Sequence, residues 1–347
     1  MAVFEHIDFD DHESVHTFKD MDSGLHAFIG VHSTHRGPAA GGARLWSYDT
    51  SQDALTDVLR LSRGMSYKNA MAGLNLGGGK AVIMRPEGAF DRAKLFTALG
   101  KCINDLGGKY YTAEDVGVSP DDMRNVQTQT KFVAGLNEGK DASGDPSPVT
   151  ADGVFRSIQV GYEKKTGSRS LKDVRVAVQG LGHVGFDLCR RLHEAGAKLT
   201  VTDINTAVLQ KAETEWGAKI VEPEDIYSVE TDVFSPCALG AVINPDTIDK
   251  LKCQVIAGAA NNQLSVAAMG KELMDRGILY CPDYVVNAGG IINIAGEIEG
   301  AYSREWVEQK LVGIEQTLSD IIDQSDKTKI ATNKIANEMA RERIGRG

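Results

Sequence analysis

The chain has 347 residues, is 42% hydrophobic and 25% charged, and carries a formal net charge of −10. This length suffices for two domains with their own cores, and the acidic balance argues against a general binder of nucleic acid or of anionic membranes. The apolar runs are too short to cross a bilayer and no signal peptide is visible, so with five scattered cysteines we expect a cytoplasmic protein with reduced thiols.

The N-terminal part of the chain alternates strand-like and helix-like patterns. Thr50 and Ser51 can cap a helix, and Lys68 follows on its apolar stripe. A lysine on a buried helix face loses its hydration unless it is paired, whereas at a frayed helix end it can extend to solvent. Both interpretations of Lys68 stay open at this point. The apolar stripe that predicts this helix consists of Ala54, Val58, Leu61 and Met65.

A glycine-rich segment, 73–80, ends in three glycines and Lys80 and leads directly into the apolar run 81–84. Consecutive glycines let the backbone approach another group closely. A flexible linker would not continue into a β-branched core strand that begins with a charged residue. Lys80, at the start of this predicted strand, is therefore a candidate for chemistry.

A short strand over 109–112 and a loop over 113–117 are expected next, followed by a helix start at 119–122. The helix start has a capping hydroxyl, a proline in the first turn and two carboxylates that face the helix dipole. This role accounts for the carboxylates of that segment. It does not account for Glu114 and Asp115 in the loop.

A dinucleotide-binding pattern begins with a predicted strand over 174–179 and the glycine loop 180–185. A helix through 184–192 and a strand over 199–203 complete the pattern, and Asp203 ends that strand. The glycines let the backbone approach a pyrophosphate at the positive helix N-terminus, and Asp203 can accept hydrogen bonds from both ribose hydroxyls. That carboxylate would repel a 2′-phosphate, so NAD is the expected cofactor. A doubly wound domain without nucleotide is the alternative.

The expected fold class is α/β with two domains: an N-terminal α/β catalytic domain and a Rossmann-type, doubly wound NAD-binding domain. We place the active site in the cleft between them. A polar segment rich in Gly, Pro and Ser marks the boundary. The expected parts are a first domain over 1–135 that holds Lys68, Lys80 and Asp115, a hinge over 136–148, the Rossmann domain over 149–325, and a C-terminal helix over 326–347 that returns towards the first domain.

His12-Glu-Ser-Val-His16 matches the H-E-x-x-H zinc signature, which requires a long helix and a third ligand. The residues over 25–33 alternate like a strand, so little helix can follow the motif. We therefore expect no metal site. His183, inside the glycine loop, is expected to face solvent or cofactor.

The NAD pattern and seven segments of the chain resemble the glutamate/leucine/phenylalanine/valine family of amino-acid dehydrogenases. Three of these segments contain Lys68, Lys80 and Asp115. The resemblance covers nearly the whole chain and is strongest to the leucine dehydrogenase branch. The segments are 37–42, 61–68, 76–80, 112–115, 234–239, 258–262 and 287–290.

The resemblance implies reversible oxidative deamination, in which an L-amino acid, NAD⁺ and water give a 2-oxo acid, ammonium and NADH. It implies that Lys68 binds the substrate carboxylate, helped by backbone N–H groups near Gly41 and Gly42. Lys80, with a lowered pKa, would be the general base, and Asp115 would relay protons. Asn262 would hold substrate against the nicotinamide. The implied cofactor contacts are Gly180, Leu181, Gly182, His183, Val184, Gly185, Phe186, Asp203, Ala238 and Asn262.

By the same resemblance, four apolar residues line the side-chain pocket, and a dicarboxylate would find no cation there. We expect a branched-chain aliphatic substrate: leucine, valine or isoleucine. Phenylalanine is the alternative substrate, and a non-catalytic dinucleotide sensor is a remote alternative function. The pocket residues are Ala40, Ala113, Ile291 and Ile294.

The resemblance makes 1–135 the catalytic, substrate and oligomerisation domain, because the family is oligomeric and its N-terminal domain is the usual contact surface. A homo-oligomer is therefore expected, with no nucleic-acid or membrane partner. The chain ends soon after 341–346, without the longer tail of some octameric relatives. A dimer is therefore favoured over an octamer.

Overall fold

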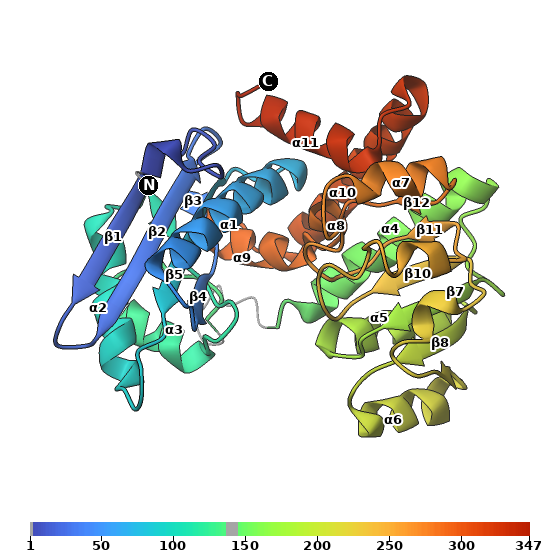
Figure 1. The fold of residues 1–347 in the computed structure, drawn as a ribbon, viewed down its shortest axis with the longest axis horizontal. Coiled ribbons are helices and arrows are strands. Elements are labelled where there is room, and N and C mark those ends of the chain that lie inside the picture. Colours follow the sequence, from blue (N-terminus) through green and yellow to red (C-terminus); the bar gives the residue numbers. More distant parts are fainter. Residues whose placement is uncertain (1–2, 137–144) are drawn as a thin grey trace. The chain divides into compact units, whose positions relative to one another are not determined.

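The computed structural model describes residues 3–136 and 145–347. Most of the predicted hinge, 136–148, falls on residues 137–144, which lie outside the described residues. The chain divides into two compact units (Figure 1). The first unit comprises Met1–Asp145, Asn293–Val307 and Ala340–Gly347, and the second comprises Pro146–Ile292 and Glu308–Met339.

The first unit is built on a six-stranded mixed sheet with helices on both faces. Its strands are β1 (Ser14–Asp20), β2 (Leu25–Ser33), β3 (Ala39–Ala40), β4 (Ala43–Trp46), β5 (Gly77–Met84) and β6 (Tyr110–Tyr111). Its helices are α1 (Ser51–Met71), α2 (Arg92–Asp105) and α3 (Pro120–Gln127), after a short 3-10 helix at Val3–Glu5.

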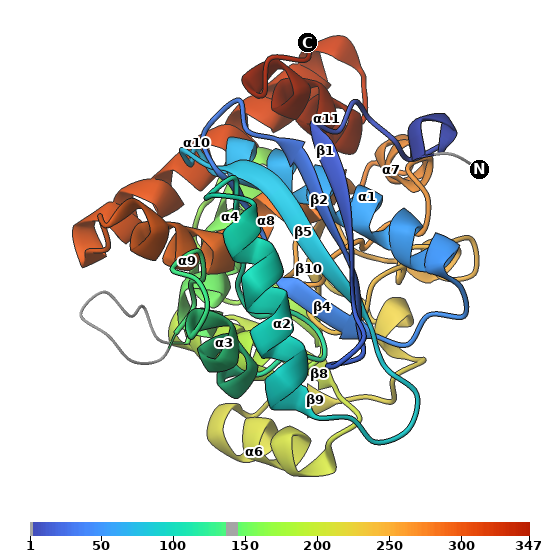
Figure 2. The ribbon, with the colours of Figure 1, turned by 90° about the vertical axis from the view of Figure 1, so that its left-hand side faces the viewer.

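The strand order is β1-β2-β5-β3-β6, and β4 also pairs with β5. Strands β1, β2 and β5 pair antiparallel, whereas β3 and β4 run parallel to β5. In Figure 2 the long strands β1, β2 and β5 lie side by side, with α1 and α2 on opposite sides of them. Strand β5 is therefore central in the sheet.

Strand β5 separates two apolar cores because its side chains alternate between the two faces of the sheet. Ala81 and Ile83 pack with the buried residues of α2 and α3. Val82 packs with the buried residues of α1. Lys80 shares the alternation of Val82, so it points to the α1 side of the sheet.

The glycines before Lys80 belong to β5, which begins at Gly77, three residues earlier than predicted. They permit a close approach between this strand and its neighbours. A Cβ on Gly78 would lie 2.0 Å from the backbone nitrogen of Ser66 in α1, and one on Gly79 would lie 2.7 Å from the ring of Tyr110. The glycines thus allow the helix and strand to pack closely.

The same contact corrects the predicted apolar stripe of α1. Leu61 and Met65 are only half-buried, whereas Ser62 and Ser66 are fully buried. Periodicity failed here because small polar residues, not large apolar ones, fit against the glycines. Their hydroxyl groups are satisfied locally: Ser62 donates to the carbonyl of Val58 at 2.7 Å.

The predicted helix start at 119–122 is confirmed as a capping box. Ser119 caps α3, its hydroxyl accepts from the N–H of Asp122, and the Asp122 carboxylate accepts from the N–H of Ser119. The predicted strand over 109–112 is shorter and corresponds to β6.

The H-E-x-x-H segment does not form a helix. Its second half enters β1, and His12 interacts with the carbonyl of Leu59 and the hydroxyl of Ser62, each at 3.0 Å. Burial lowers the pKa of His12 to about 4, so the ring is neutral. Among the described residues, no cluster of three His, Cys, Asp or Glu side chains could hold a metal ion.

The second unit contains a six-stranded parallel sheet. Its strands are β7 (Arg175–Gln179), β8 (Lys198–Thr202), β9 (Lys219–Ile220), β10 (Val233–Pro236), β11 (Val255–Ile256) and β12 (Leu279–Tyr280). The helices of the remaining chain are α4 (Ser147–Thr166), α5 (His183–Glu194), α6 (Thr206–Trp216), α7 (Met269–Asp275), α8 (Asp283–Val286), α9 (Gly289–Glu299), α10 (Arg304–Thr328) and α11 (Thr332–Arg343), with 3-10 turns at Ile226–Ser228 and Ile248–Lys250.

The sheet order β12-β11-β10-β7-β8-β9 is that of a doubly wound dinucleotide-binding fold. The direction of winding reverses between β7 and β10, where such folds bind ligands at the carboxyl ends of the strands. The predicted strand, glycine loop, helix and second strand are confirmed as β7, the 180–182 turn, α5 and β8. The α/β fold class with a Rossmann-type domain is confirmed.

Two later segments complete the first unit. At the end of α9, Glu297 accepts a hydrogen bond from the N–H of Gly135 at 2.7 Å. In the last residues, Arg343 donates to the carbonyls of Ala70 and Met71, each at 3.2 Å, at the C-terminus of α1.

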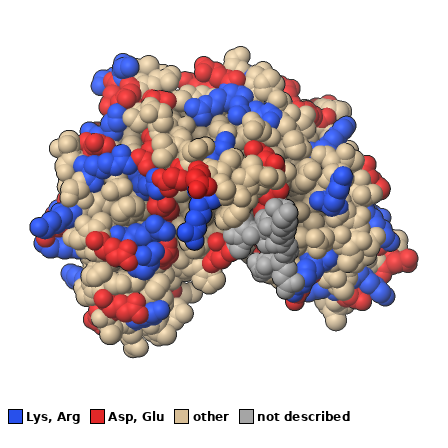
Figure 3. Space-filling model, turned by 180° about the vertical axis from the view of Figure 1, so that it is seen from behind, with Lys and Arg blue, Asp and Glu red and all other residues tan. Residues whose placement is uncertain are grey.

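In the part of the chain that the structure describes, no helix has the length and apolar character needed to span a membrane. On the face drawn in Figure 3, acidic and basic side chains are interspersed.

Candidate functional site

Lys80 and Asp115 meet in the first unit. Lys80 is only 5% exposed in the middle of β5, and its Nζ lies 2.6 Å from Oδ2 of Asp115. Asp115 lies in the loop after β6, and a bridge between Ala43 and Glu114 places this loop beside the start of β4. Both residues were singled out from the sequence, and the fold brings them into contact.

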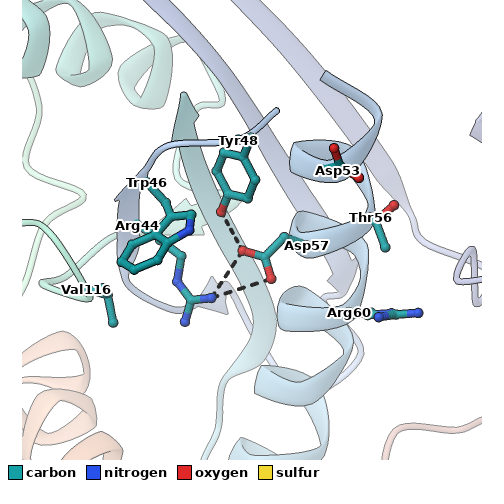
Figure 4. A pocket seen from close by; sticks show the side chains of 8 residues that line it. All are labelled: Arg44, Trp46, Tyr48, Asp53, Thr56, Asp57, Arg60 and Val116. Carbon is teal, nitrogen blue, oxygen red and sulfur yellow. Dashed lines mark hydrogen bonds and ion pairs between the residues drawn. The ribbon is translucent and has the colours of Figure 1, made fainter. Parts of the chain in front are cut away.

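Three further polar residues extend this pair. Arg44 of β4 donates through Nε to Oδ2 of Asp115 at 3.1 Å and through Nη1 to Oδ2 of Asp57 in α1 at 3.1 Å. Tyr48 donates its hydroxyl to the same Asp57 oxygen at 2.5 Å (Figure 4). Lys80, Asp115, Arg44, Asp57 and Tyr48 are named the charged cluster below.

Arg44, Asp57 and Tyr48 were missed from the sequence. The available signal was weak: Arg44 stands between the buried residues Ala43 and Leu45, where alternation places it on the other face of the strand. Nothing local links Arg44 to a carboxylate on the following helix.

The cluster lowers the pKa of both Lys80 and Asp115. Burial lowers the pKa of Lys80 below its ordinary value and the charge of Arg44 lowers it further, whereas Asp115 and Asp57 oppose this. Burial alone would raise the pKa of Asp115, but Lys80 and Arg44 together hold it below its ordinary value. Arg44 lowers both pKa values, but it contributes less than burial does at Lys80 and less than Lys80 does at Asp115.

The predicted substrate residues of the first unit lie on neighbouring elements. Lys68 is half-buried in the last turn of α1, the helix that also carries Asp57. Gly41 and Gly42 connect β3 to β4, and a Cβ on Gly42 would lie 2.8 Å from the Cβ of Asp115. The N–H of Gly41 donates to the carbonyl of Tyr111 at 3.2 Å. Gly42 is therefore the better placed of the two glycines to donate to a ligand.

The predicted pocket residues Ala40 and Ala113 are buried in the first unit. A Cβ on Gly135 would lie 3.8 Å from that of Ala113, and Glu297 of α9 bonds to Gly135. Ile294 precedes Glu297 by three residues, so it projects from the same side of α9. Ile291 is one turn earlier on this helix and is buried.

The three glycines of the nucleotide loop have different environments. Gly180 has a φ of 98°, which favours glycine, and a Cβ there would lie 2.6 Å from the Cβ of Ala238. A Cβ on Gly185 would lie 2.0 Å from the carbonyl oxygen of Gly180. At Gly182, by contrast, no atom of the described residues lies within 4 Å of an added Cβ. Gly182 therefore lines open space at the start of α5.

This loop has the features that a dinucleotide requires. Helix α5 begins after Gly182 without a side-chain cap, which leaves its first N–H groups for an anion. Asp203 follows β8, and its carboxylate accepts from the N–H of Leu181 at 2.6 Å and from that of Asn205 at 2.8 Å. A carboxylate has further lone pairs, so this fixed orientation still leaves acceptors for ribose hydroxyls. The residues present fit NAD.

The other predicted cofactor residues are placed as follows. His183 and Ala238 are exposed, Val184 is half-buried, and Leu181 is buried. Phe186 packs its ring against Trp216 of α6, with centroids 4.6 Å apart. Asn262 is exposed, has a positive φ of 52°, and lies beyond β11 in the second unit.

Two family models match long parts of the chain. Residues 12–132 match the model of the Glu/Leu/Phe/Val dehydrogenase dimerisation domain, and residues 205–346 match that of glutamate/leucine/phenylalanine/valine dehydrogenase. The leucine dehydrogenase of Thermoactinomyces intermedius is 47% identical over 99% of this chain and 94% of its own length. The phenylalanine dehydrogenase of Bacillus thermotolerans is 42% identical over 96% of this chain and 88% of its own.

Among solved structures, the L-tryptophan dehydrogenase from Nostoc punctiforme superposes with a TM-score of 0.86 at 40% identity and covers 96% of both chains.

Proposed function

The chain belongs to the glutamate/leucine/phenylalanine/valine dehydrogenase family, and from that premise we propose that it catalyses the reversible, NAD-dependent oxidative deamination of a branched-chain aliphatic L-amino acid. The products are the 2-oxo acid, ammonium and NADH. The observation that carries the proposal is the buried contact of 2.6 Å between Lys80 and Asp115. It supplies a base and a proton relay in one place.

Lys68 binds the substrate carboxylate as a point charge, with the N–H of Gly42 as a second donor. Neutral Lys80 accepts at Nζ a proton from the water that attacks the iminium carbon of the substrate. Asp115 passes the proton taken up by Lys80 on to the amino group of the resulting carbinolamine. The C–N bond then breaks and ammonia leaves, while the carbinolamine hydroxyl gives its proton back to the Lys80–Asp115 pair and becomes the carbonyl of the 2-oxo acid. The released ammonia takes up a proton from solvent to form ammonium. Bound NAD⁺ supplies the acceptor for the hydride that leaves the substrate Cα.

NAD is held by the glycine loop and by Asp203. Gly182 and the first N–H groups of α5 receive the pyrophosphate, and Asp203 accepts from the ribose hydroxyls. The negative charge of Asp203 disfavours a 2′-phosphate, and the residues after it, Ile204 and Asn205, are not cationic. Asn262 contributes to substrate and cofactor positioning.

Substrate choice rests on the apolar residues Ala40, Ala113, Ile291 and Ile294. A glutamate side chain would lose its hydration without gaining a cation, which costs several kcal/mol. Among apolar substrates a methylene changes discrimination by only about 1–3 kcal/mol, so phenylalanine is the second candidate. The leucine dehydrogenase relative supports the first choice and the phenylalanine dehydrogenase relative the second.

The test is NADH formation by the purified protein with NAD⁺ and a panel of L-amino acids at mildly alkaline pH. We expect a strong signal with leucine, valine or isoleucine and none with glutamate. A rate for phenylalanine well above that for leucine would select the second candidate. If no amino acid of the panel gives NADH although the protein binds NADH, the result would favour the non-catalytic dinucleotide sensor.

A homo-oligomer, with a dimer favoured over an octamer, is part of the proposal. The description of the matched N-terminal model as a dimerisation domain supports assembly. Sedimentation equilibrium of the purified protein distinguishes the two states. Free cysteines support a cytoplasmic location.

A further inference from the structure

We propose that Arg44, held in place by Asp57 and Tyr48, is a positioning residue that sets the orientation and charge distribution of the Lys80–Asp115 pair. The inference rests on the function proposed above. Arg44 is not assigned a contact with substrate or cofactor. It acts through Asp115.

Two basic side chains share one carboxylate oxygen of Asp115. Nζ of Lys80 and Nε of Arg44 both lie against Oδ2 of Asp115, at 2.6 and 3.1 Å. When Lys80 is neutral, Asp115 still has a cationic partner. Without Arg44 the same step would leave a carboxylate that is only 23% exposed without a charged partner, which is costly.

Arg44 is itself held by hydrogen bonds on its far side. Its Nη1 lies 3.1 Å from Oδ2 of Asp57, and the hydroxyl of Tyr48 donates to that oxygen at 2.5 Å. The anchor therefore involves β4, the segment after β4, and α1. This fixes the guanidinium with Nε towards Asp115 and Nη1 towards Asp57.

The charges around Lys80 act on its protonation in opposite directions. Positive Arg44 disfavours the Lys80 ammonium, whereas negative Asp57 and Asp115 favour it. Other titratable groups on the surrounding elements are Tyr48 after β4, Tyr110 and Tyr111 on β6, Glu114 next to Asp115, His26 and His32 on β2, and Asp53, Arg60, Arg63, Tyr67 and Lys68 on α1. Loss of Arg44 should make Lys80 hold its proton to higher pH, and loss of the Asp57 charge should do the reverse.

The direction in which each variant shifts the pH profile distinguishes this role from a purely structural one. If Arg44 and Asp57 only braced the fold, removing either would harm activity in the same way at every pH. If they set the charge of Lys80, their removal should move the acidic limb of the pH profile in opposite directions.

The cluster also opens to solvent, which allows a rescue experiment. Arg44 and Asp57 line a pocket of about 500 Å³ together with Trp46, Tyr48 and Val116 (Figure 4). A guanidinium ion can therefore enter where a truncated Arg44 side chain has been removed.

The experiment compares kcat/KM for leucine against pH in wild type, Arg44→Ala, Arg44→Lys and Asp57→Asn. Arg44→Ala should lower the rate near neutral pH about 10-fold or more and move the acidic limb up by about one pH unit. Asp57→Asn should move that limb down. Arg44→Lys should retain most of the limb position, because it keeps the charge, and millimolar guanidinium should restore Arg44→Ala.

Arg175→Ala is the matched control. Arg175 forms a comparable pair with Asp232, at 2.9 Å, at the start of β7 in the second unit. Its removal should leave the pH profile unchanged. Shifts of the same sign in Arg44→Ala and Asp57→Asn, or no shift in either, would overturn the inference. If Arg44→Ala does not fold, the pH profiles of the isosteric Asp57→Asn and the charge-retaining Arg44→Lys test the inference in its place.

A readout without turnover separates this inference from the proposed function. The pH dependence of Lys80 acetylation by acetic anhydride, followed by peptide mass spectrometry, reports the amine directly. If the wild type deaminates no amino acid, the proposed function fails while the labelling still tests Arg44. If the wild type deaminates leucine but the variants change neither the acidic limb of the pH profile nor the pH dependence of Lys80 acetylation, only the inference on Arg44 fails.

Discussion

The nucleotide loop and the charged cluster differ in how the chain builds them. The loop is continuous from Gly180 to Gly185, and its acidic partner, Asp203, directly follows the next strand. The charged cluster draws Lys80, Asp115 and Arg44 from three separate elements and Asp57 from a fourth. A site made by a continuous segment can be recognised from its spacing alone. A site assembled by a sheet and a helix is recognised only where single residues violate the local pattern.

The largest expected effect separates the two regions by function. Lys80→Ala should lower kcat about 10³-fold, because it removes the general base, while NADH affinity measured by fluorescence stays close to that of wild type. Lys19→Ala is the control, since Lys19 is an exposed lysine on β1 of the same unit. A variant that kept most of its rate would show that Lys80 is not the base.

Asp203→Ser should have the opposite effect and weaken cofactor binding more than it lowers kcat. The loss of a charged acceptor for the ribose should weaken NAD⁺ binding about 10- to 100-fold, seen as a raised KM for NAD⁺. The value of kcat at saturating NAD⁺ should change much less. An unchanged KM would mean that Asp203 does not contact the cofactor, and a comparable fall in kcat would break the comparison between the two regions.

Within the loop, Gly185→Ala and Gly182→Ala should have different consequences. Gly185→Ala places a Cβ 2.0 Å from the carbonyl oxygen of Gly180, so it should destabilise the second unit by about 1–3 kcal/mol. Gly182→Ala meets open space in the protein. It should leave the unfolding temperature without nucleotide nearly unchanged and weaken NADH binding. Equal loss of stability in both would show that Gly182 is only structural.

The smallest effect tests the helix that carries Asp57 and Lys68. Gly64 lies in the interior of α1, and none of the described residues approaches an added Cβ within 4 Å. Gly64→Ala should stabilise the first unit by about 0.5–1 kcal/mol through helix propensity, measured by thermal unfolding. Gly78→Ala, on the strand facing this helix, should destabilise it instead.

Prediction from the sequence succeeded for the nucleotide loop and only in part for the charged cluster. The strand, glycine loop, helix and acidic residue of the nucleotide site were predicted in order because each step is local. Lys80 and Asp115 were found because no structural role explained them. Arg44 was missed because its partner Asp57 is on the next helix, and only the folded sheet brings them together.

The packing of α1 shows a second limit. Ser62 and Ser66 are buried although they are polar, because Gly30 and Gly78 bring neighbouring strands against them. Hydrophobic periodicity cannot detect a face made of small residues. The strand start at Gly77 was missed for the same reason, since consecutive glycines without a neighbour in view resemble a loop.

The return of the last residues to the first unit has a consequence for synthesis on the ribosome. Arg343 binds the carbonyls at the end of α1, and Arg346 donates to the carbonyls of Asp11 and His32, at 2.6 and 2.8 Å. All of these acceptors are translated early and their donors last. The whole second unit is therefore translated before the first can acquire these contacts, so the order of translation and the order of completion are opposite.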